Sequence, residues 1–449
     1  MVPNSFIPKQ TRQGPYADAN TRKYISTLLA AFMINFTACG ILFGFGIYQH
    51  HYETMVLDES TPFYGASTAS IDLIGTLAAS LMTIVAPFVM SWTRHFEPLF
   101  VTTAGGVLFG IAGVLASYGK TLWHFQLAQG LLMGLATGLS FVPSMTLAPT
   151  WFDEHRGLAM GLVSSRTGVG GLVWAPILSS CIASMGFRNT LRMTSCVGLV
   201  VICFSGLFLD WEPSMKRQLL NQGEGRSGAA ALFDIPLPSQ FTINQRAFVL
   251  LAICTVAQSA AYYTPVFFMA LYSQTLGYSE SSGAYLTAAS NACNAIGKIA
   301  MGFVADRLGR LNSFLLVTFL AAASTLGLWL SSTLVGNVNE SVARSLFVAF
   351  IVLYGLFASA FISLLPVAIV ELYGVKEIPR MAGVIYLLQG LAVLVGTPVA
   401  GVLVPGNEVD RDPSSYTSLA ALVGGLMAVA ALGTAGVSFE AVRVAKLDR

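Results

Sequence analysis

The stretch SNACNAIGKIAMGFVADRLGR, residues Ser290 to Arg310, joins two patterns that together indicate how the chain folds. Its first part is apolar enough for a helix in hydrocarbon, and its last part is a charged turn. Lys298 nevertheless lies inside the apolar part, eight residues before Asp306. A charged side chain at the bilayer centre costs at least ~2.5–3.5 kcal/mol on insertion scales, so it usually faces a cavity. We therefore expect a membrane helix in which Lys298 faces a polar path.

The composition supports a membrane protein. Of the 449 residues, 55% are hydrophobic and only 10% are charged, whereas soluble domains carry about 25% charged residues. The net charge of +2 gives no reason to expect a nucleic-acid partner. The six cysteines fall in apolar runs without metal-ligand spacing, so we expect packing roles and no metal site. The polar, proline-containing first ~20 residues do not resemble a cleavable signal peptide.

Apolar runs long enough to cross the ~30 Å hydrocarbon layer recur along the whole chain. We expect an all-α membrane protein with twelve transmembrane helices in two six-helix halves. The predicted division is a tail at 1–23, a first half at 24–209, a linker at 210–245, a second half at 246–438 and a tail at 439–449. The expected spans are 24–48, 66–90, 98–117, 122–147, 157–182, 190–209, 246–272, 282–304, 312–332, 343–370, 380–404 and 416–438.

Loop charge predicts the orientation, because cytoplasmic loops carry an excess of Lys and Arg. With the amino terminus in the cytoplasm, most of the 24 Lys and Arg residues fall on the cytoplasmic side, so we expect both termini there. Asn339 then lies in an outer loop, where Asn339-Glu340-Ser341 is a candidate glycosylation acceptor. Arg166 and Lys298 are the two cations expected within spans.

A weak repeat relates the two halves. Arg156 opens the fifth expected span as RGLAMGLVSSRTGVGG, and Arg380 opens the eleventh as RMAGVIYLLQGLAVLVG. The two spans are six apart, which fits halves related by an axis along the membrane normal.

The chain resembles the major facilitator superfamily. GFVADRLGR, residues 302–310, is similar to the superfamily's loop signature, and residues 127–171 resemble the fungal branch of the monocarboxylate transporter-like family. FGFGIYQHHYE at 43–53 and GFRNTLRM at 186–193 resemble the same branch. The resemblance implies a major facilitator fold and secondary transport by alternating access, with a site between the halves. Family members move small carboxylates, often with a proton, and some fungal relatives move vitamins or exported metabolites.

The chain departs from that family pattern at charged positions. Animal members carry an Asp and an Arg where Asn294 and Lys298 stand, and a first-span lysine where Phe45 stands. Fungal relatives usually have a small residue at Arg166 and a Gln at Asp72. The resemblance therefore does not carry over the family's usual proton-coupling groups, and protons remain only a candidate co-substrate.

Lys298 shares one helix face with Asn294 and Asn291, at spacings of four and three residues. Such a polar stripe indicates a water-filled path. Lys298 lies roughly 12 Å from Asp306 along a helix. We interpret Lys298 as a cation for a substrate carboxylate or phosphate; the alternative is a lysine that snorkels or pairs structurally.

Arg166 lies ten residues after Arg156, roughly 15 Å into the membrane. If the fifth and eighth spans adjoin, Arg166 and Lys298 form an anion site. The alternative is an internal pair between Arg166 and Asp72, which is compatible with a site if substrate displaces the carboxylate.

Further polar residues are expected to line the cavity, although each alone is equally consistent with an interhelical hydrogen bond. They are Asn35, Gln129, Gln258, Tyr262, Ser363 and Gln389. Glycines at 130, 134 and 138, and at 168, 170 and 171, predict close helix contact rather than hinges.

The charged turn predicts a cytoplasmic gate. Gly302, Asp306, Arg307 and Arg310 belong to the loop motif. Asp306 is expected to accept hydrogen bonds from free N–H groups at the start of a neighbouring helix, and the arginines to anchor the turn at the charged leaflet.

These patterns favour a carrier for a small organic anion in the lipid bilayer, with no cofactor and no catalytic residues. The chain has no GxxxxGK[ST] loop and no nucleophile–base constellation, so we expect neither direct ATP drive nor an enzyme. The alternative is an exporter of a neutral or bulky fungal metabolite, which the many aromatics favour. A solute sensor is disfavoured because the tails are short. We expect a monomer in the plasma membrane.

Overall fold

The computed structural model describes all residues except 1–15, 153–154, 218–234, 240–244, 405–411 and 448–449. The described part consists of helices joined by turns and short irregular segments. In the first group they are α1 (Tyr16–Phe43), α2 (Phe45–Thr54), α3 (Thr68–Ile84), α4 (Ala86–His95), α5 (Pro98–Ser117), α6 (Leu122–Phe125), η1 (Gln126–Leu132), α7 (Met133–Leu147), η2 (Ala148–Trp151) and α8 (Arg156–Gly206).

The second group follows residues 207–245. Its members are α12 (Arg246–Thr275), α13 (Glu280–Leu308), α14 (Arg310–Ser324), η3 (Thr325–Trp329), α15 (Leu330–Val335), α16 (Glu340–Ala358), α17 (Ala360–Tyr373), η4 (Val375–Glu377), α18 (Ile378–Val402), η6 (Pro413–Tyr416) and α19 (Thr417–Leu447).

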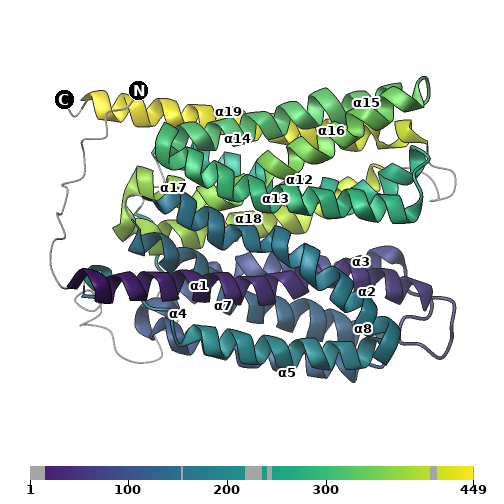
Figure 1. Ribbon diagram of the computed structural model, residues 1–449, viewed down its shortest axis with the longest axis horizontal. Coiled ribbons are helices and arrows are strands. Elements are labelled where there is room, and N and C mark those ends of the chain that lie inside the picture. Colours follow the sequence, from purple (N-terminus) through teal and green to yellow (C-terminus); the bar gives the residue numbers. More distant parts are fainter. Residues whose placement is uncertain (1–15, 153–154, 218–234, 240–244, 405–411, 448–449) are drawn as a thin grey trace.

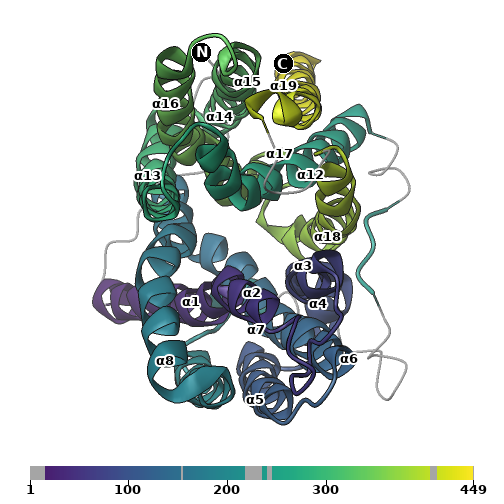
Figure 2. The ribbon, with the colours of Figure 1, turned by 90° about the vertical axis from the view of Figure 1, so that its right-hand side faces the viewer.

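The helices run along the long axis of the molecule in two bundles. Figure 1 shows α1 beginning and α19 ending at the same, left-hand end. Figure 2 looks along the helices and shows the first group below the second. The bundles meet where α13 packs on α8 and where α18 packs on α3 and α4. Any site between the groups is therefore bordered by α8 and α13 on one side and by α3 and α18 on the other.

Nine helices in the described part are long and apolar enough to cross a membrane, or ten if α3 and α4, bent by 44° at their junction, form one span. The twelve expected spans exceed this number for two reasons. The fifth and sixth expected spans lie in one element, α8, whose 51 residues contain a break at Gly186, and α13 is not among the nine. The polar stripe of Asn291, Asn294 and Lys298 and the charged end of α13 lower the mean hydropathy of this helix.

α8 is too long to cross a bilayer once, since 51 residues span roughly 77 Å at 1.5 Å per residue. Its helical geometry is interrupted at Gly186, which has φ 78° and ψ 157°. Residues with a side chain rarely adopt this positive φ, so glycine permits the chain to turn there. The two arms of α8 correspond to the fifth and sixth spans expected from the sequence.

α8 and α13 approach each other backbone to backbone along a seam. A Cβ atom added to Gly157 would lie 2.5 Å from the carbonyl oxygen of Gly302, and one on Gly161 would lie 2.4 Å from that of Lys298. One on Gly168 would lie 2.3 Å from the carbonyl oxygen of Asn291. The expected close-contact role of Gly168 is confirmed, because any side chain at these glycines would separate the two groups of helices.

The first described residues of the expected linker are held against the first group. Trp211 Nε1 donates to the carbonyl oxygen of Thr93 at 3.2 Å, and Lys216 Nζ lies 3.2 Å from Asp210 and 3.3 Å from Glu97. Burial by itself lowers the pKa of Lys216, but the hydrogen bonds and charges of the two carboxylates outweigh it and leave the pKa raised. Residues 218–234 and 240–244 of that linker lie outside the described residues.

Gly168→Ala tests the seam. The added methyl group would meet backbone atoms on α13, and overpacking of this kind costs typically 1–3 kcal/mol. We expect a lower melting temperature in detergent than for the wild-type protein. Gly425→Ala on α19 is the control, since a Cβ there meets nothing within 4 Å. Equal melting temperatures for the two variants would contradict the backbone contact.

Candidate functional site

A single carboxylate closes one end of the α8–α13 seam. Asp306 Oδ1 accepts from the backbone N–H of Gly157 and Oδ2 from that of Leu158, both at 2.8 Å. These N–H groups belong to the first turn of α8 and have no partner within the helix, and the positive end of the helix dipole favours a negative charge there. The contact expected from the sequence is therefore present, and it joins the last turn of α13 to the first turn of α8.

The two arginines of the same turn contact an aromatic ring and a carboxylate. Arg307 places its guanidinium carbon 4.2 Å from the ring centroid of Phe303. Arg310 Nη1 lies 2.9 Å from Glu371 Oε2 on α17. Gly302 belongs to the seam, because a Cβ on it would lie 2.3 Å from the carbonyl oxygen of Gly157. At this end Gly302 and Asp306 thus join α13 to α8, and Arg310, the first residue of α14, joins α14 to α17.

Lys298 lies further along the seam and is fully buried. Its Nζ donates to Thr167 Oγ1 on α8. Thr167 Oγ1 donates in turn to Asn294 Oδ1 at 3.3 Å, and Asn294 Nδ2 donates to the hydroxyl of Tyr262 on α12 at 3.1 Å. This polar chain crosses between the two groups of helices. No carboxylate among the described residues forms an ion pair with Lys298.

Arg166, next to Thr167 in the chain, is also buried, at 1% exposure. Its Nη1 donates to the carbonyl oxygen of Val163 at 3.0 Å and contacts Met145 Sδ at 3.1 Å. Its guanidinium carbon lies 5.1 Å from the ring centroid of Phe141, and its Nε has no hydrogen-bond partner among the described residues. The guanidinium therefore lacks a counter-charge within the described part of the chain.

The internal pair between Arg166 and Asp72 is not formed. Asp72 is partly buried on α3, where its Oδ2 accepts from Thr76 Oγ1 at 3.3 Å. The ion pairs of the described residues do not include one between Asp72 and Arg166. Of the two alternatives drawn from the sequence, the internal neutralisation of Arg166 is thus absent from this conformation.

The two buried cations belong to one electrostatic neighbourhood. Arg166 is adjacent in the chain to Thr167, whose hydroxyl accepts from Lys298 Nζ, and Cys39 lies on α1. Cys39 Sγ lies 4.0 Å from Arg166 Nη2. Two like charges held in a buried region without a carboxylate are costly, and an anion bound between them would lower that cost.

Several residues around Arg166 were not singled out as site residues by the sequence. Phe141, whose ring centroid lies 5.1 Å from the guanidinium carbon, lies 6.0 Å from Tyr386 between ring centroids. Thr167 could have been noticed as a polar neighbour of Arg166. The partners on other helices had no sequence signal, because each stands in an apolar run and only the packing brings it to Arg166.

The other polar residues that the sequence predicts to line the cavity differ in their hydrogen bonding. Asn35 donates to Ser144 Oγ at 2.6 Å, and Gln129 accepts from the Tyr52 hydroxyl at 2.9 Å, so both form interhelical hydrogen bonds. Gln258 is fully buried, and neither of its amide atoms has a partner among the described residues. Gln389 is buried, and Asn291 is partly buried against Gly171.

Asn339 lies apart from this cluster. It is exposed and caps α16, where its Oδ1 accepts from the N–H of Val342 at 3.2 Å. Ser363 donates to the carbonyl oxygen of Ala360 on its own helix. Within the described ranges, no group of three or more His, Cys, Asp or Glu side chains is arranged to hold a metal ion.

Comparison with known proteins gives one family and a consistent set of relatives. A family model described as Major Facilitator Superfamily matches residues 25–343 and 251–444. An MFS-type transporter of Gibberella moniliformis is 26% identical over 90% of this chain and 87% of its own length. The aspyridones efflux protein apdF of Emericella nidulans is 26% identical over 94% of this chain and 80% of its own. Among solved structures, the proton:xylose symporter XylE matches with a TM-score of 0.64 at 15% identity, over 92% of this chain and 95% of that one.

Asp306→Asn tests the contact at the end of the seam. The amide loses the negative charge that favours the helix N-terminus and can place only one acceptor oxygen there, so we expect the seam to open more often. The measurement is the rate at which a maleimide labels Cys39 in a variant where Cys39 is the only cysteine.

The control for that experiment is Glu377→Gln, which removes a carboxylate that pairs with Arg380 and belongs neither to α8 nor to the loop motif. We expect faster labelling in Asp306→Asn than in Glu377→Gln. The same rate in both variants would show that the Asp306 contact does not hold the seam closed.

Proposed function

Because the chain belongs to the major facilitator superfamily and is a membrane transporter, not an enzyme, we propose that it carries a small organic anion by alternating access. The substrate class that the site suits is a monocarboxylate. The observation that carries this proposal is that the side chains of Arg166 and Lys298 are both buried and have no carboxylate partner in the described part of the chain. A substrate carboxylate between them would supply the missing charge.

In this proposal each cation contacts the carboxylate differently. The Arg166 guanidinium has five N–H donors, and Nε is without a partner among the described residues, so it can bind a carboxylate in a bidentate manner. Lys298 exchanges its hydrogen bond with Thr167 for one with the substrate. Asn294, Asn291, Tyr262, Gln258 and Gln389 are proposed as neutral groups that contact the rest of the substrate.

The proposed cycle uses the α8–α13 seam as its moving contact. Asp306 holds the seam closed at one end, and release of its carboxylate from α8 opens a path from that side to Lys298. An empty site with both ends closed leaves two buried charges uncompensated, so the loaded carrier reorients more readily than the empty one.

The proposed topology has twelve crossings. It takes the ten spans counted with the bent α3–α4 pair, the second arm of α8 after Gly186, and α13. α1 begins and α19 ends at the same end of the molecule, which is consistent with both termini lying in the cytoplasm. The halves at 24–209 and 246–438, the linker at 210–245 and the tails at 1–23 and 439–449 are part of this proposal.

We further propose a plasma-membrane monomer with Asn339 glycosylated on the outer side. Its exposure at the start of α16 supports that modification. Asn294 stands where animal members of the resembled family have an acid, so the proposed transport is not coupled to protons through that position.

The second candidate function is efflux of a neutral or bulky metabolite. Aromatic rings favour it: Tyr263 lies 4.9 Å from Tyr262, 5.7 Å from Phe43 and 6.2 Å from Phe267 between centroids. The relative from Emericella nidulans is also named as an efflux protein. Transport of a neutral compound that survives loss of both cations would favour this function.

Arg166→Gln and Lys298→Gln test the anion site. A hydrogen bond to a charged group contributes about 1.5–3 kcal/mol, so each variant should lose roughly tenfold or more in exchange rate. The measurement is counterflow of labelled monocarboxylates in proteoliposomes. Arg192→Gln, which removes an arginine hydrogen-bonded to Ser117 Oγ, is the control. Unchanged counterflow of every anion in Arg166→Gln would contradict an anion site at Arg166.

Asn294→Asp tests whether position 294 faces the bound anion. The ionised carboxylate introduced at this position would neutralise Lys298 and compete with the substrate, and its protonation would restore the cation. We therefore expect slower counterflow at neutral pH that recovers as the pH falls, whereas the wild-type rate changes little. A variant with the wild-type rate and pH profile would show that Asn294 does not face the bound anion.

A further inference from the structure

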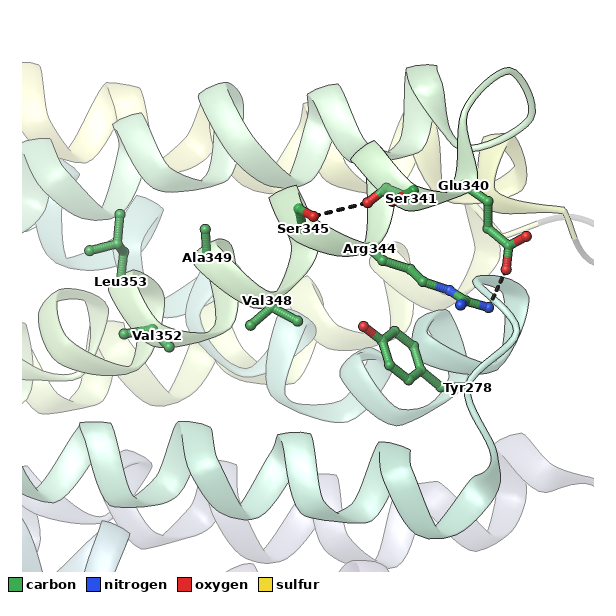
Figure 3. Close-up of a pocket in the computed structure, with 9 residues that line it drawn as sticks. All are labelled: Tyr278, Glu340, Ser341, Arg344, Ser345, Val348, Ala349, Val352 and Leu353. Atoms are coloured by element: carbon green, nitrogen blue, oxygen red, sulfur yellow. Dashed lines mark hydrogen bonds and ion pairs between the residues drawn. The ribbon is translucent and has the colours of Figure 1, made fainter.

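A hollow on the surface of α16 begins at Glu340, the first residue of this helix, and neither Arg166 nor Lys298 lines it. Its volume is about 870 Å³, and Figure 3 shows its lining. Eight of the lining residues belong to α16, and Tyr278 comes from the turn between α12 and α13. The lining of the hollow does not include any residue of the proposed substrate site.

The outer end of the hollow carries fixed charges of both signs. Arg344 Nη2 forms an ion pair with Glu340 Oε1, and Arg344 Nε donates to the carbonyl oxygen of Leu276 at 2.6 Å. The guanidinium carbon lies 5.2 Å from the ring centroid of Tyr278. Gly277 packs against the pair so closely that a Cβ on it would lie 2.5 Å from Arg344 Nη2. The two charges are therefore held in place and remain partly exposed, at 39% and 55%.

The inner part of the hollow is apolar. Val348, Val352 and Leu353 follow the polar residues along α16, and each is between 37% and 38% exposed. From Arg344 to Leu353 the helix rises roughly 13 Å. Charged and hydroxyl side chains thus alternate over the first six residues of α16, and the apolar strip follows them, as Figure 3 shows.

We propose that this hollow binds one phospholipid with a zwitterionic headgroup. The phosphate contacts Arg344 and the ammonium group contacts Glu340, because the pair offers one charge of each sign and no net charge. One acyl chain lies along Val348, Val352 and Leu353, where burial of apolar surface stabilises it. A net anionic headgroup would leave Glu340 facing uncompensated negative charge.

The lipid bridges α16 and the turn before α13. Tyr278 lies two residues before Glu280, the first residue of α13, so a headgroup bound beside Tyr278 restrains that end of the helix. The inference does not depend on which solute is transported.

The test is native mass spectrometry of the protein released from nanodiscs that contain equal amounts of phosphatidylcholine and phosphatidylglycerol with the same acyl chains. We expect one retained phosphatidylcholine. Arg344→Gln should lower its retention by about tenfold, the loss expected for one charge-assisted hydrogen bond. Arg192→Gln is the matched control, because Arg192 also lies over a tyrosine ring, 4.7 Å from the centroid of Tyr118.

Two further variants keep the proposal falsifiable if Arg344→Gln folds poorly. Ala349→Phe places a ring in the apolar strip and should abolish retention while leaving the charged pair intact. Glu340→Gln should shift the preference toward phosphatidylglycerol. Preferential retention of phosphatidylglycerol by the wild-type protein, equal retention in Arg344→Gln and Arg192→Gln, or no retained lipid at all would overturn the proposal.

Discussion

The contact between the backbones of α8 and α13 determines how Asp306 and Lys298 meet the first group of helices. Glycines at 157, 161 and 168 let the two helices approach closely. A Cβ at any of these three positions would clash with a carbonyl oxygen of α13. That distance brings the Asp306 carboxylate onto the free N–H groups of α8 and brings Lys298 within reach of Thr167. A seam held by small residues, and not by interlocking long side chains, can also separate and re-form without repacking a core.

The second constraint is electrostatic. A buried ion pays a desolvation cost of several kcal/mol even after relaxation, and a like charge nearby adds to it. Arg166 reduces this cost with a carbonyl oxygen, a thioether and the face of Phe141, and Lys298 with the Thr167 hydroxyl. These partners are neutral, so they solvate the cations without cancelling their charge. A site of this kind favours an anion that comes and goes over a permanent internal carboxylate.

The sequence predicted the parts of this arrangement that follow from one helix at a time. The stripe of Asn291, Asn294 and Lys298 and the acceptor role of Asp306 come from spacing along α13 and from the chemistry of helix ends. The contact of Lys298 with Thr167 depends on the register between two helices, which spacing within either helix does not define. Asp72 was a reasonable partner for Arg166 by composition, but its carboxylate is held on α3 by Thr76.

Hydropathy alone does not identify α13 as a membrane span. The polar stripe of α13, which the sequence predicts to face a polar path, is the feature that removes this helix from those that are apolar enough to cross a membrane. The expected spans 157–182 and 190–209 leave a gap that contains Gly186, and the positive φ of this glycine divides α8 into two arms there. The helix that carries Lys298 therefore fits a membrane span poorly by composition, whereas α8, which carries Arg166, fits one well.

The most direct test of the central claim compares acids with their neutral isosteres on the unmodified protein. Binding of a series of monocarboxylates and of the corresponding primary amides to the purified transporter would be measured by isothermal titration calorimetry. The two shapes are nearly equal, so the difference isolates the charge that Arg166 and Lys298 would meet. The account predicts that an acid in the series binds at least about tenfold more tightly than its amide. Amides that bind as well as, or better than, every acid would contradict it.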